Sequence, residues 1–262
     1  MLPERLWVQI TSPLGKKFTI NFMSFNKKHI LVLGGSSDIG FEVIKNLLSL
    51  DYKVSAHYFK NNNNLLKLRN NNLSLIKLDF TNFNNSKIDK IIKSKFNGKY
   101  DSIINLVGYI DNKSFQSTNL KSIIKSIISN AIIPILIQRN AIKHMLSKNW
   151  GRILNCSSIG VKFGGGKNSY NYSLSKHSLE FIPNEFKFWA TKNVLINNLR
   201  IGVTNTKIHK RMKKNLNLKK RIKLIPMKRM AEANEISKYI VNLASEENSF
   251  ITGETITVAG GE

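Results

Sequence analysis

The segment SYNYSLSK, residues 169–176, holds a tyrosine and a lysine whose spacing suits proton transfer. In a helix successive residues turn by about 100°, so Tyr172 and Lys176 share one face while Tyr170 points elsewhere. A phenol with its ordinary pKa of about 10 is a poor acid or base near neutral pH. A nearby ammonium favours the phenolate, so we expect Lys176 to lower the pKa of Tyr172. On its own such a pair is most often a chance arrangement on a solvated helix. The elements around it must therefore show whether the pair is part of a functional site.

Seven short apolar runs rich in β-branched residues are predicted to be strands buried on both faces. They occupy residues 29–35, 53–59, 73–79, 100–108, 152–158, 194–202 and 255–261. Apolar residues recur with the spacing of a helix in residues 40–50, 85–96, 118–148, 170–191 and 232–246. This alternation predicts an α/β fold, a single Rossmann-type doubly wound parallel sheet with helices on both faces. Ligands bind such a sheet at the carboxyl ends of its strands, so the turns after the strands should hold the chemistry.

The length of 262 residues fits one domain, because no Pro-, Gly- or Ser-rich linker interrupts the chain. Residues 1–27 stand outside the strand and helix alternation as an N-terminal extension. Apolar and polar residues alternate there around SPLG, which predicts a β-hairpin. Alternatively Met23 is the true start, since the residues after it lead directly into the first strand. Residues 28–262 form the main domain.

The formal net charge of +25 would ordinarily indicate a nucleic-acid or anionic-surface partner. Lysine outnumbers arginine about four to one, and asparagine and isoleucine are abundant, a pattern that AT-rich codons produce across a proteome. DNA-reading proteins rely on arginine, and the basic residues are spread along the chain. We therefore expect no nucleic-acid partner.

Cys156 is the single cysteine, which excludes an intramolecular disulfide and favours a reducing compartment. Its apolar surroundings, RILNCSS, indicate a buried thiol. No metal site is expected, since no ligand-like spacing joins the five histidines, which are His29, His57, His144, His177 and His209. No apolar run is expected to span a bilayer and the N-terminus does not resemble a signal peptide, so the prediction is a soluble cytoplasmic protein without a membrane partner.

The segment LGGSSDIG, residues 33–40, lies between the first predicted strand and the first helix. A glycine-rich turn at this place lets a dinucleotide pyrophosphate approach the backbone and meet the free N–H groups of the helix start. The turn resembles the TGxxxGIG pattern of the short-chain dehydrogenase/reductase family. Gly34, Ile39 and Gly40 match the pattern, whereas Leu33 replaces Thr and Asp38 replaces the middle Gly.

The resemblance extends from about residue 28 to residue 262, with the motifs in the family's order. INLVG (104–108) resembles NNAG, GRILNCSSIG (151–160) resembles the strand with the catalytic serine, and YSLSK holds the tyrosine and lysine. LRIGVTNT (199–206) resembles the segment that holds the nicotinamide, with Ile201 in place of Pro. The spacing from Ser158 to Tyr172 is one residue longer than is commonest in the family. The resemblance implies a ketone/alcohol oxidoreductase with the catalytic residues Asn130, Ser158, Tyr172 and Lys176.

The resemblance also assigns a role to each catalytic residue. Tyr172 is expected to donate the proton in reduction and accept it in oxidation, and Ser158 to hold the substrate oxygen. Lys176 is expected to bind the nicotinamide ribose, and Asn130 to hold a water that links Lys176 to solvent. Tyr170 is expected to be a packing or pocket residue.

The cofactor preference is predicted from AHYFKNNNN, residues 56–64, which ends the second strand. An acidic residue there suits an unmodified ribose, but the segment has no Asp or Glu and contains Lys60, which favours NADP(H) over NAD(H). Asp79 matches the family's acidic residue that contacts the adenine. The predicted cofactor-binding residues are Gly34, Ser36, Ser37, Asp38, Ile39, Gly40, Tyr58, Lys60, Asp79, Phe80, Asn105, Gly108, Tyr172, Lys176, Val203 and Thr206.

The substrate is less constrained than the reaction. The sequence most resembles the 3-oxoacyl-acyl-carrier-protein reductase branch, and it is also similar to reductases of surface-sugar pathways, which would act on a nucleotide-linked sugar. The basic segment 206–226 lies where the family has its substrate lid, and it is interpreted either as a surface that attracts an anionic substrate or as a solvated helix. A non-catalytic dinucleotide-binding regulator is the alternative from another class. The predicted helices at 118–148 and 170–191 are similar to those that form the dimer and tetramer interfaces of the family. The resemblance therefore implies a homodimer or homotetramer.

Overall fold

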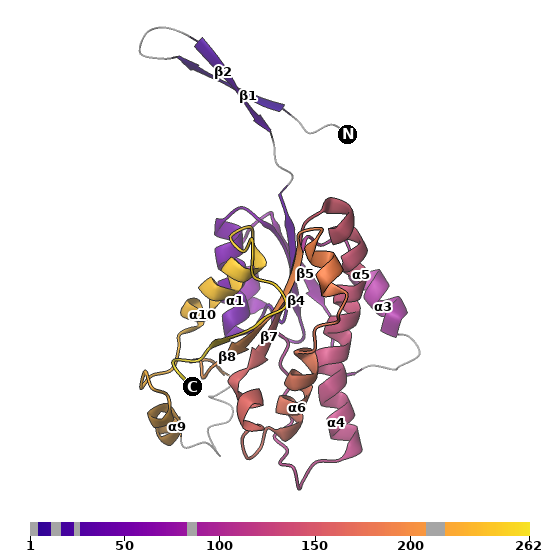
Figure 1. The fold of residues 1–262 in the computed structure, drawn as a ribbon, viewed down its shortest axis with the longest axis vertical. Coiled ribbons are helices and arrows are strands. Elements are labelled where there is room, and N and C mark those ends of the chain that lie inside the picture. Colours follow the sequence, from indigo (N-terminus) through magenta and orange to yellow (C-terminus); the bar gives the residue numbers. More distant parts are fainter. Residues whose placement is uncertain (1–4, 12–16, 24–26, 83–87, 208–217) are drawn as a thin grey trace.

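The computed structural model describes residues 5–11, 17–23, 27–82, 88–207 and 218–262 of the chain (Figure 1). Its strands are β1 (Arg5–Thr11), β2 (Lys17–Met23), β3 (His29–Leu33), β4 (Lys53–Tyr58), β5 (Leu73–Lys77), β6 (Ser102–Asn105), β7 (Gly151–Ser158), β8 (Val194–Ile201) and β9 (Thr255–Val258). Its α-helices are α1 (Asp38–Ser49), α2 (Asn63–Leu66), α3 (Ile88–Lys95), α4 (Leu120–Ile127), α5 (Ile133–Lys148), α6 (Tyr170–Leu179), α7 (Phe186–Ala190), α9 (Leu218–Leu224) and α10 (Ala233–Ala244).

Seven strands form one sheet in the order β5-β4-β3-β6-β7-β8-β9, and every neighbouring pair is parallel. The predicted Rossmann-type doubly wound sheet is confirmed, with all seven predicted strands in it. The chain winds outward from β3 to β5, then crosses back to β6 and winds the other way. Such a reversal opens a crevice at the carboxyl ends of the strands on either side of it.

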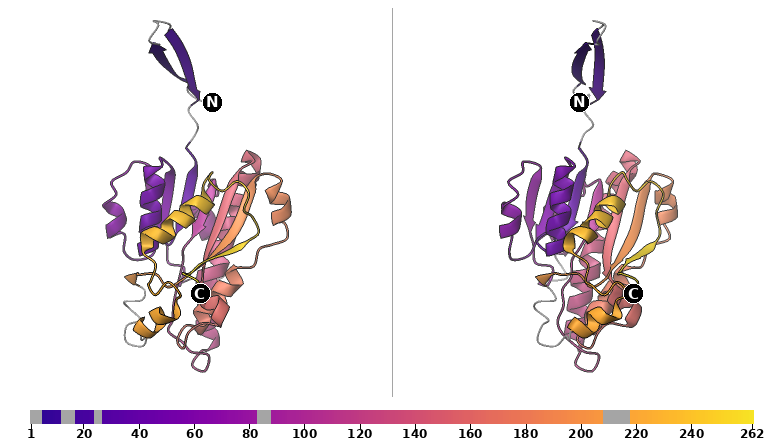
Figure 2. Two further views of the ribbon diagram at one scale, coloured as in Figure 1. Left: turned by 60° about the vertical axis from the view of Figure 1, so that its left-hand side comes forward. Right: turned by 90° about the vertical axis from the view of Figure 1, so that its left-hand side faces the viewer.

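Helices cover both faces of the sheet, and each face has its own apolar core (Figure 2). On one face α1 packs against α10, and Val43, Ile44 and Leu47 of α1 are fully buried over β3 and β4. On the other face α3 and α5 pack against the sheet and bury residues such as Ile92 and Ile137. The strands are therefore buried on both sides, as their continuous apolar runs predict.

The predicted helix at 118–148 exists, but it is interrupted by a π-helical turn at Ile128–Ile132 between α4 and α5. It begins at Asn119, whose side chain accepts a hydrogen bond from the Ser122 N–H in a capping box. By length and composition alone, this run at Leu120–Lys148 could cross a membrane, so the expectation that no apolar run has that length is wrong. It is instead a core helix, because it packs along the sheet through buried residues such as Ile133 and Met145.

The predicted single helix at 170–191 is wrong, because α6 ends at Leu179 and the short α7 begins only at Phe186. Pro183 lies between them. Proline has no N–H to donate within a helix and disfavours the helical conformation of the residue before it, here Ile182. The break leaves α6 as a ten-residue helix that carries the Tyr and Lys pair at the end of the sheet.

The N-terminal strands β1 and β2 pair antiparallel, from Arg5 opposite Met23 to Thr11 opposite Lys17, in a sheet separate from the main one. Met23 is the last residue of β2. The alternative start of the chain at Met23 stays a prediction.

Candidate active site

A cleft of about 2090 Å³ runs along the carboxyl ends of the strands. Its walls come from the glycine turn, the ends of β4 to β7, the start of α6 and the segment 201–207 after β8. Most of the predicted site residues line it, namely Gly34, Ser36, Ser37, Asp38, Ile39, Lys60, Asp79, Phe80, Gly108, Ser158, Tyr172, Lys176, Val203 and Thr206. Among the predicted residues, all of which the structure describes, Gly40, Tyr58, Asn105 and Asn130 do not line the cleft.

The side chains of Ser158, at the end of β7, and Tyr172, in the first turn of α6, lie next to each other. The Ser158 Oγ accepts a hydrogen bond of 3.1 Å from the Gly160 N–H, and the Ser158 hydroxyl lies near enough to the Tyr172 phenol to lower its pKa. The Tyr172 ring passes close to Gly108, where an added Cβ would lie 3.9 Å from the phenolic oxygen. The two hydroxyl groups therefore converge on one point of the cleft, although Ser158 and Tyr172 lie one residue further apart in sequence than is usual.

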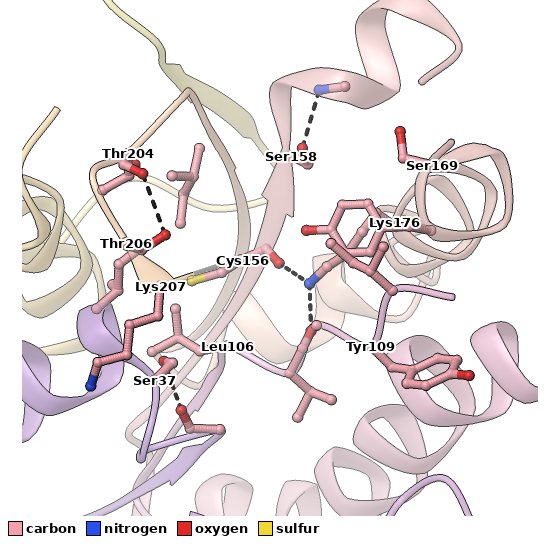
Figure 3. A pocket seen from close by; sticks show the side chains of 18 of the residues that line it. Ser37, Leu106, Tyr109, Cys156, Ser158, Ser169, Lys176, Thr204, Thr206 and Lys207 are labelled. Atoms are coloured by element: carbon pink, nitrogen blue, oxygen red, sulfur yellow. Dashed lines mark hydrogen bonds between the residues drawn. The ribbon is translucent and has the colours of Figure 1, made fainter. Parts of the chain in front are cut away.

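The ammonium of Lys176 is held by two backbone carbonyls (Figure 3). Its Nζ donates to the Val107 oxygen at 2.7 Å and to the Cys156 oxygen at 2.5 Å. It lies 5.9 Å from the centroid of the Tyr172 ring. The carbonyls come from the ends of β6 and β7, so the crevice between these neighbouring strands fixes the lysine beside the tyrosine.

The pKa values in this cluster differ from the prediction made from spacing. Burial raises the pKa of Tyr172 to about 12, and the neighbouring Ser158 hydroxyl offsets this only in part. Burial also lowers the pKa of Lys176 to about 8. The predicted lowering of the Tyr172 pKa is therefore wrong for this structure, because taking the phenol out of water disfavours the phenolate more than the surrounding groups favour it.

Asn130 lies in the π-helical turn and is completely buried. Its Oδ1 accepts from the Tyr109 N–H at 2.7 Å, and its Nδ2 donates to the Tyr109 oxygen at 2.9 Å and to the Ser175 Oγ at 2.8 Å. The amide thereby ties the loop after β6 to α6, which carries Tyr172 and Lys176. This fixes the position of two cleft walls relative to each other.

The glycine turn is tightly packed, which explains its glycines. Gly34 has a φ of +78°, and a Cβ there would lie 3.0 Å from the Leu106 backbone. A Cβ at Gly40 would lie 2.6 Å from the Gly34 oxygen. The Ser37 Oγ caps α1 by accepting from the Gly40 N–H at 3.0 Å. The turn can thus present its backbone to a phosphate group.

Two residues that the sequence reasoning did not single out support this turn. The Nδ1 of His57 accepts from the Gly34 N–H at 3.2 Å, and its Nε2 donates to the Leu78 oxygen at 2.9 Å. Lys207 contacts Asp38 at the start of α1. His57 could have been found from the sequence, because it is a polar residue inside an apolar strand predicted to end beside the glycine turn. Lys207 could not, because nothing distinguishes it from the many other lysines of the chain.

The end of β4 and the end of β5 form the other wall of this part of the cleft. Lys60 lines it together with the neutral residues Phe59 and Asn61. The Asp79 carboxylate accepts from both the N–H and the hydroxyl of Thr81, at 2.8 Å each, and so closes a local turn. The ends of β4 and β5 therefore supply groups that suit the adenosine half of a dinucleotide.

The segment predicted as a substrate lid, 206–226, is described only in part, since residues 208–217 lie outside the described residues. In α9, Leu218, Arg221 and Leu224 line the cleft. The Arg221 guanidinium is paired with the buried carboxylate of Glu262.

Comparisons with known proteins agree with this architecture. A family model described as enoyl-(acyl carrier protein) reductase matches residues 34–262. The 3-oxoacyl-(acyl-carrier-protein) reductase FabG of Buchnera aphidicola subsp. Schizaphis graminum is 29% identical over 256 residues, which cover 91% of this chain and 98% of that protein. The acetoacetyl-CoA reductase of Shinella zoogloeoides is 28% identical over 88% of this chain and 97% of its own length.

Among solved structures, ElxO with NADP bound is 26% identical and superimposes with a TM-score of 0.76 over 90% of this chain and 98% of its own. The family match begins at Gly34, directly after β3, and it includes the other six strands of the main sheet and the residues that line the cleft.

Proposed function

Because the chain belongs to the short-chain dehydrogenase/reductase family, as an NAD(P)-dependent ketone reductase like the 3-oxoacyl-(acyl-carrier-protein) reductases, we propose that its catalytic residues are Asn130, Ser158, Tyr172 and Lys176. The observation that carries this proposal is the meeting of the Ser158 and Tyr172 hydroxyl groups in the cleft, beside the ammonium of Lys176.

A nicotinamide held in this cleft would supply a hydride to the ketone carbon, which leaves an alkoxide oxygen that needs a proton. Tyr172, whose pKa is raised to about 12, remains protonated at neutral pH and can donate its proton to the alkoxide oxygen. Ser158 holds the same oxygen by hydrogen bonding and stabilises the charge that develops on it. A protonated phenol suits reduction, whereas alcohol oxidation requires the phenolate and is favoured only at alkaline pH.

Lys176 and Asn130 support the proton donor. Two N–H groups of the Lys176 ammonium donate to the Val107 and Cys156 carbonyls, which leaves one N–H to bind a ribose hydroxyl. Asn130 holds the Tyr109 backbone against α6. Its proposed role in holding a water for proton resupply uses the remaining lone pair of the Oδ1.

NADP(H) is the proposed preferred cofactor. Lys60 lines the cleft at the end of β4, and residues 56–64 contain no Asp or Glu that would repel a 2′-phosphate. Lys67 lines the same part of the cleft and adds a second positive charge. The single buried Cys156 fits the reducing cytoplasm, which we propose as the location of the enzyme.

Substituting Tyr172→Phe tests the proton donor, with Tyr170→Phe as the matched control two residues away. We expect Tyr172→Phe to lower the turnover of a 3-oxoacyl thioester about 10²–10⁴-fold, the usual contribution of general acid catalysis. Tyr170 packs edge-on against Phe115 outside the cleft wall, so Tyr170→Phe should leave turnover nearly unchanged. NADPH or NADH consumption measures the rate, and cofactor fluorescence shows whether binding persists. Survival of the Tyr172→Phe rate within about tenfold would rule out Tyr172 as the main donor.

The proposed substrate is a 3-oxoacyl group linked as a thioester to an anionic carrier. The positive side chains of Lys125 and Lys167 line the cleft, and Arg221 on α9, which is paired with Glu262, lines it too. Both relatives described above are named as reductases of acyl thioesters. A nucleotide-linked sugar remains the second candidate, since the same cations suit a diphosphate.

Charge reversal of the basic segment separates carrier recognition from chemistry. The test replaces Lys219 and Lys220 of α9, together with Lys213 and Lys214 outside the described residues, by Glu. We expect KM to rise for a carrier-protein-bound substrate but not for a short thioester analogue, because only the carrier has an extended acidic surface. Equal increases for both substrates would contradict a carrier-binding role.

A further inference from the structure

Asp38 places a carboxylate where a dinucleotide pyrophosphate is expected. It is the first residue of α1, and the N–H groups and positive dipole end of such a helix are the usual seat of a phosphate. The family pattern has glycine at this position. An unpaired carboxylate there would repel the pyrophosphate, so its charge has to be offset for the cleft to bind a dinucleotide well.

Lys207 contacts this carboxylate at two points. Its backbone N–H donates to the Asp38 Oδ2 at 2.6 Å, and its Nζ lies 3.3 Å from the Oδ1. The Asp38 side chain is 24% exposed and the Lys207 side chain is 61% exposed, so the carboxylate is partly shielded by the cleft wall while the ammonium faces solvent. Figure 3 shows the Lys207 side chain extending from the segment after β8 toward the glycine turn, near Ser37.

The segment 202–207 is fixed on its other side as well. The Ala231 N–H donates to the Val203 oxygen at 3.0 Å, and the Asn205 N–H donates to the Ala231 oxygen at 2.8 Å. Residues on both sides of the Asp38–Lys207 contact line the same cleft, among them Ser37 and Thr206. The contact therefore joins two cleft walls that are 169 residues apart in sequence.

We propose that Asp38 and Lys207 are a positioning pair for the cofactor, in which Lys207 neutralises Asp38 and joins segment 202–207 to the glycine turn at the pyrophosphate position. Lys207 thus acts mainly through Asp38 and not as an independent phosphate ligand. The inference rests on the dinucleotide binding of the proposed function, but it concerns a pairing that the reaction itself does not require.

Three substitutions separate the parts of the contact. Lys207→Met removes the ammonium and keeps the backbone N–H. Asp38→Asn removes the negative charge and keeps an oxygen that can accept from that N–H, whereas Asp38→Gly removes both. Lys45→Met is the matched control, because it breaks the Glu42–Lys45 ion pair of 3.7 Å on the same helix, away from the cleft wall.

The experiment titrates each protein with NADPH and follows cofactor fluorescence. We expect Lys207→Met to raise the Kd about fivefold in the wild-type background, as for loss of a partly exposed charge pair, and less than about twofold in the Asp38→Asn or Asp38→Gly background. Lys45→Met should leave the Kd unchanged. An equal rise of the Kd in all backgrounds would overturn the pairing and make Lys207 a direct phosphate ligand. No rise in any background would overturn it too.

Hydrogen exchange of the protein without added cofactor gives an independent readout. Asp38→Gly should speed exchange in a peptide covering residues 203–207, because the Lys207 N–H loses its acceptor, while Asp38→Asn should largely preserve its protection. Unchanged exchange in Asp38→Gly would contradict the joining of the two segments. Failure of the wild-type protein to bind NADPH would instead contradict the proposed function, so the two failures are distinguishable.

Discussion

The neutral imidazole ring of His57 supports the glycine turn by accepting a hydrogen bond from its backbone. The ring is 4% exposed, stacks on Phe80 with a centroid distance of 4.1 Å, and accepts from the Gly34 N–H through its Nδ1. A second proton would turn this nitrogen into a donor that faces another donor. Burial accordingly lowers the pKa of His57 to about 4, against weaker raising effects of the Leu78 carbonyl and Asp79.

This pKa predicts a loss of stability in acid. The unfolded chain binds a proton near pH 6.5 and the folded chain only near pH 4, so between these values the unfolded state holds more protons. The free energy of unfolding should therefore fall as the pH falls through this window, by up to about 3 kcal/mol from this group. His57→Gln, which keeps one donor and one acceptor, should make the stability less dependent on pH in urea unfolding at about pH 7 and pH 4.5.

His177→Gln is the control for this prediction, because His177 lies exposed on α6. It should leave the acid-induced loss as large as in the wild-type protein. An equally large loss in His57→Gln would show that other groups dominate the acid response.

At the residue scale, spacing and order identified which side chains meet but not their ionisation. Tyr172 and Lys176 share a helix face as their four-residue separation predicts, and Ser158 meets them from the end of β7. The direction of the tyrosine pKa shift could not be predicted, because it depends on burial by segments far away in sequence. The carbonyls that hold Lys176, from Val107 and Cys156, are likewise backbone groups that no side-chain motif reveals.

At the element scale, the glycine turn depends on close backbone contact between β3 and α1. A Cβ at Gly40 would lie 2.6 Å from the Gly34 oxygen and 2.9 Å from the Gly35 Cα, both of which are backbone atoms that cannot rotate away. Gly40→Ala should therefore lower the free energy of unfolding by about 1–3 kcal/mol, as overpacking usually does, and weaken NADPH binding. Thermal unfolding and a fluorescence titration measure the two effects.

Gly166→Ala makes the same chemical change elsewhere on the cleft wall. Its Cβ would meet only the Ser169 Oγ at 3.5 Å, an ordinary contact. Stability and NADPH affinity should stay close to the wild-type values in this variant. Similar losses in Gly40→Ala and Gly166→Ala would show that the tight turn is not the cause.

The elements themselves were largely predictable, and their interruptions were not. Continuous apolar runs located all seven strands of the main sheet, because strands buried on both faces need them. The π-helical turn at Ile128–Ile132 could not be predicted, since it contains no Gly or Pro and tertiary contacts of Asn130 accompany it. The end of α6 was predictable from Pro183, which the helical spacing of the flanking residues obscured.

At the scale of the whole molecule, apolar residues remain exposed along one side of the α4 to α5 run. They are Leu120 at 73%, Ile124 at 45%, Ile132 at 41% and Ile135 at 38% exposure. Their spacing keeps them on a common helix face, and a row of this kind indicates a protein interface. We propose that this face binds a second copy of the chain, which would give the homodimer or homotetramer predicted from sequence.

Replacing Ile124 and Ile132 by Glu tests this interface. The wild-type protein should sediment as a dimer or tetramer of the 29.8 kDa chain. The double variant places charges in an apolar contact, so the protein concentration at which its assembly dissociates should be at least about tenfold higher than for the wild-type protein. Leu50→Glu introduces a charge at an equally exposed leucine (59%) just after α1 and should leave the assembly unchanged. Circular dichroism verifies that each variant is folded. Sedimentation of the wild-type protein as a monomer, or an assembly unaffected by the two glutamates, would place the interface elsewhere or exclude it.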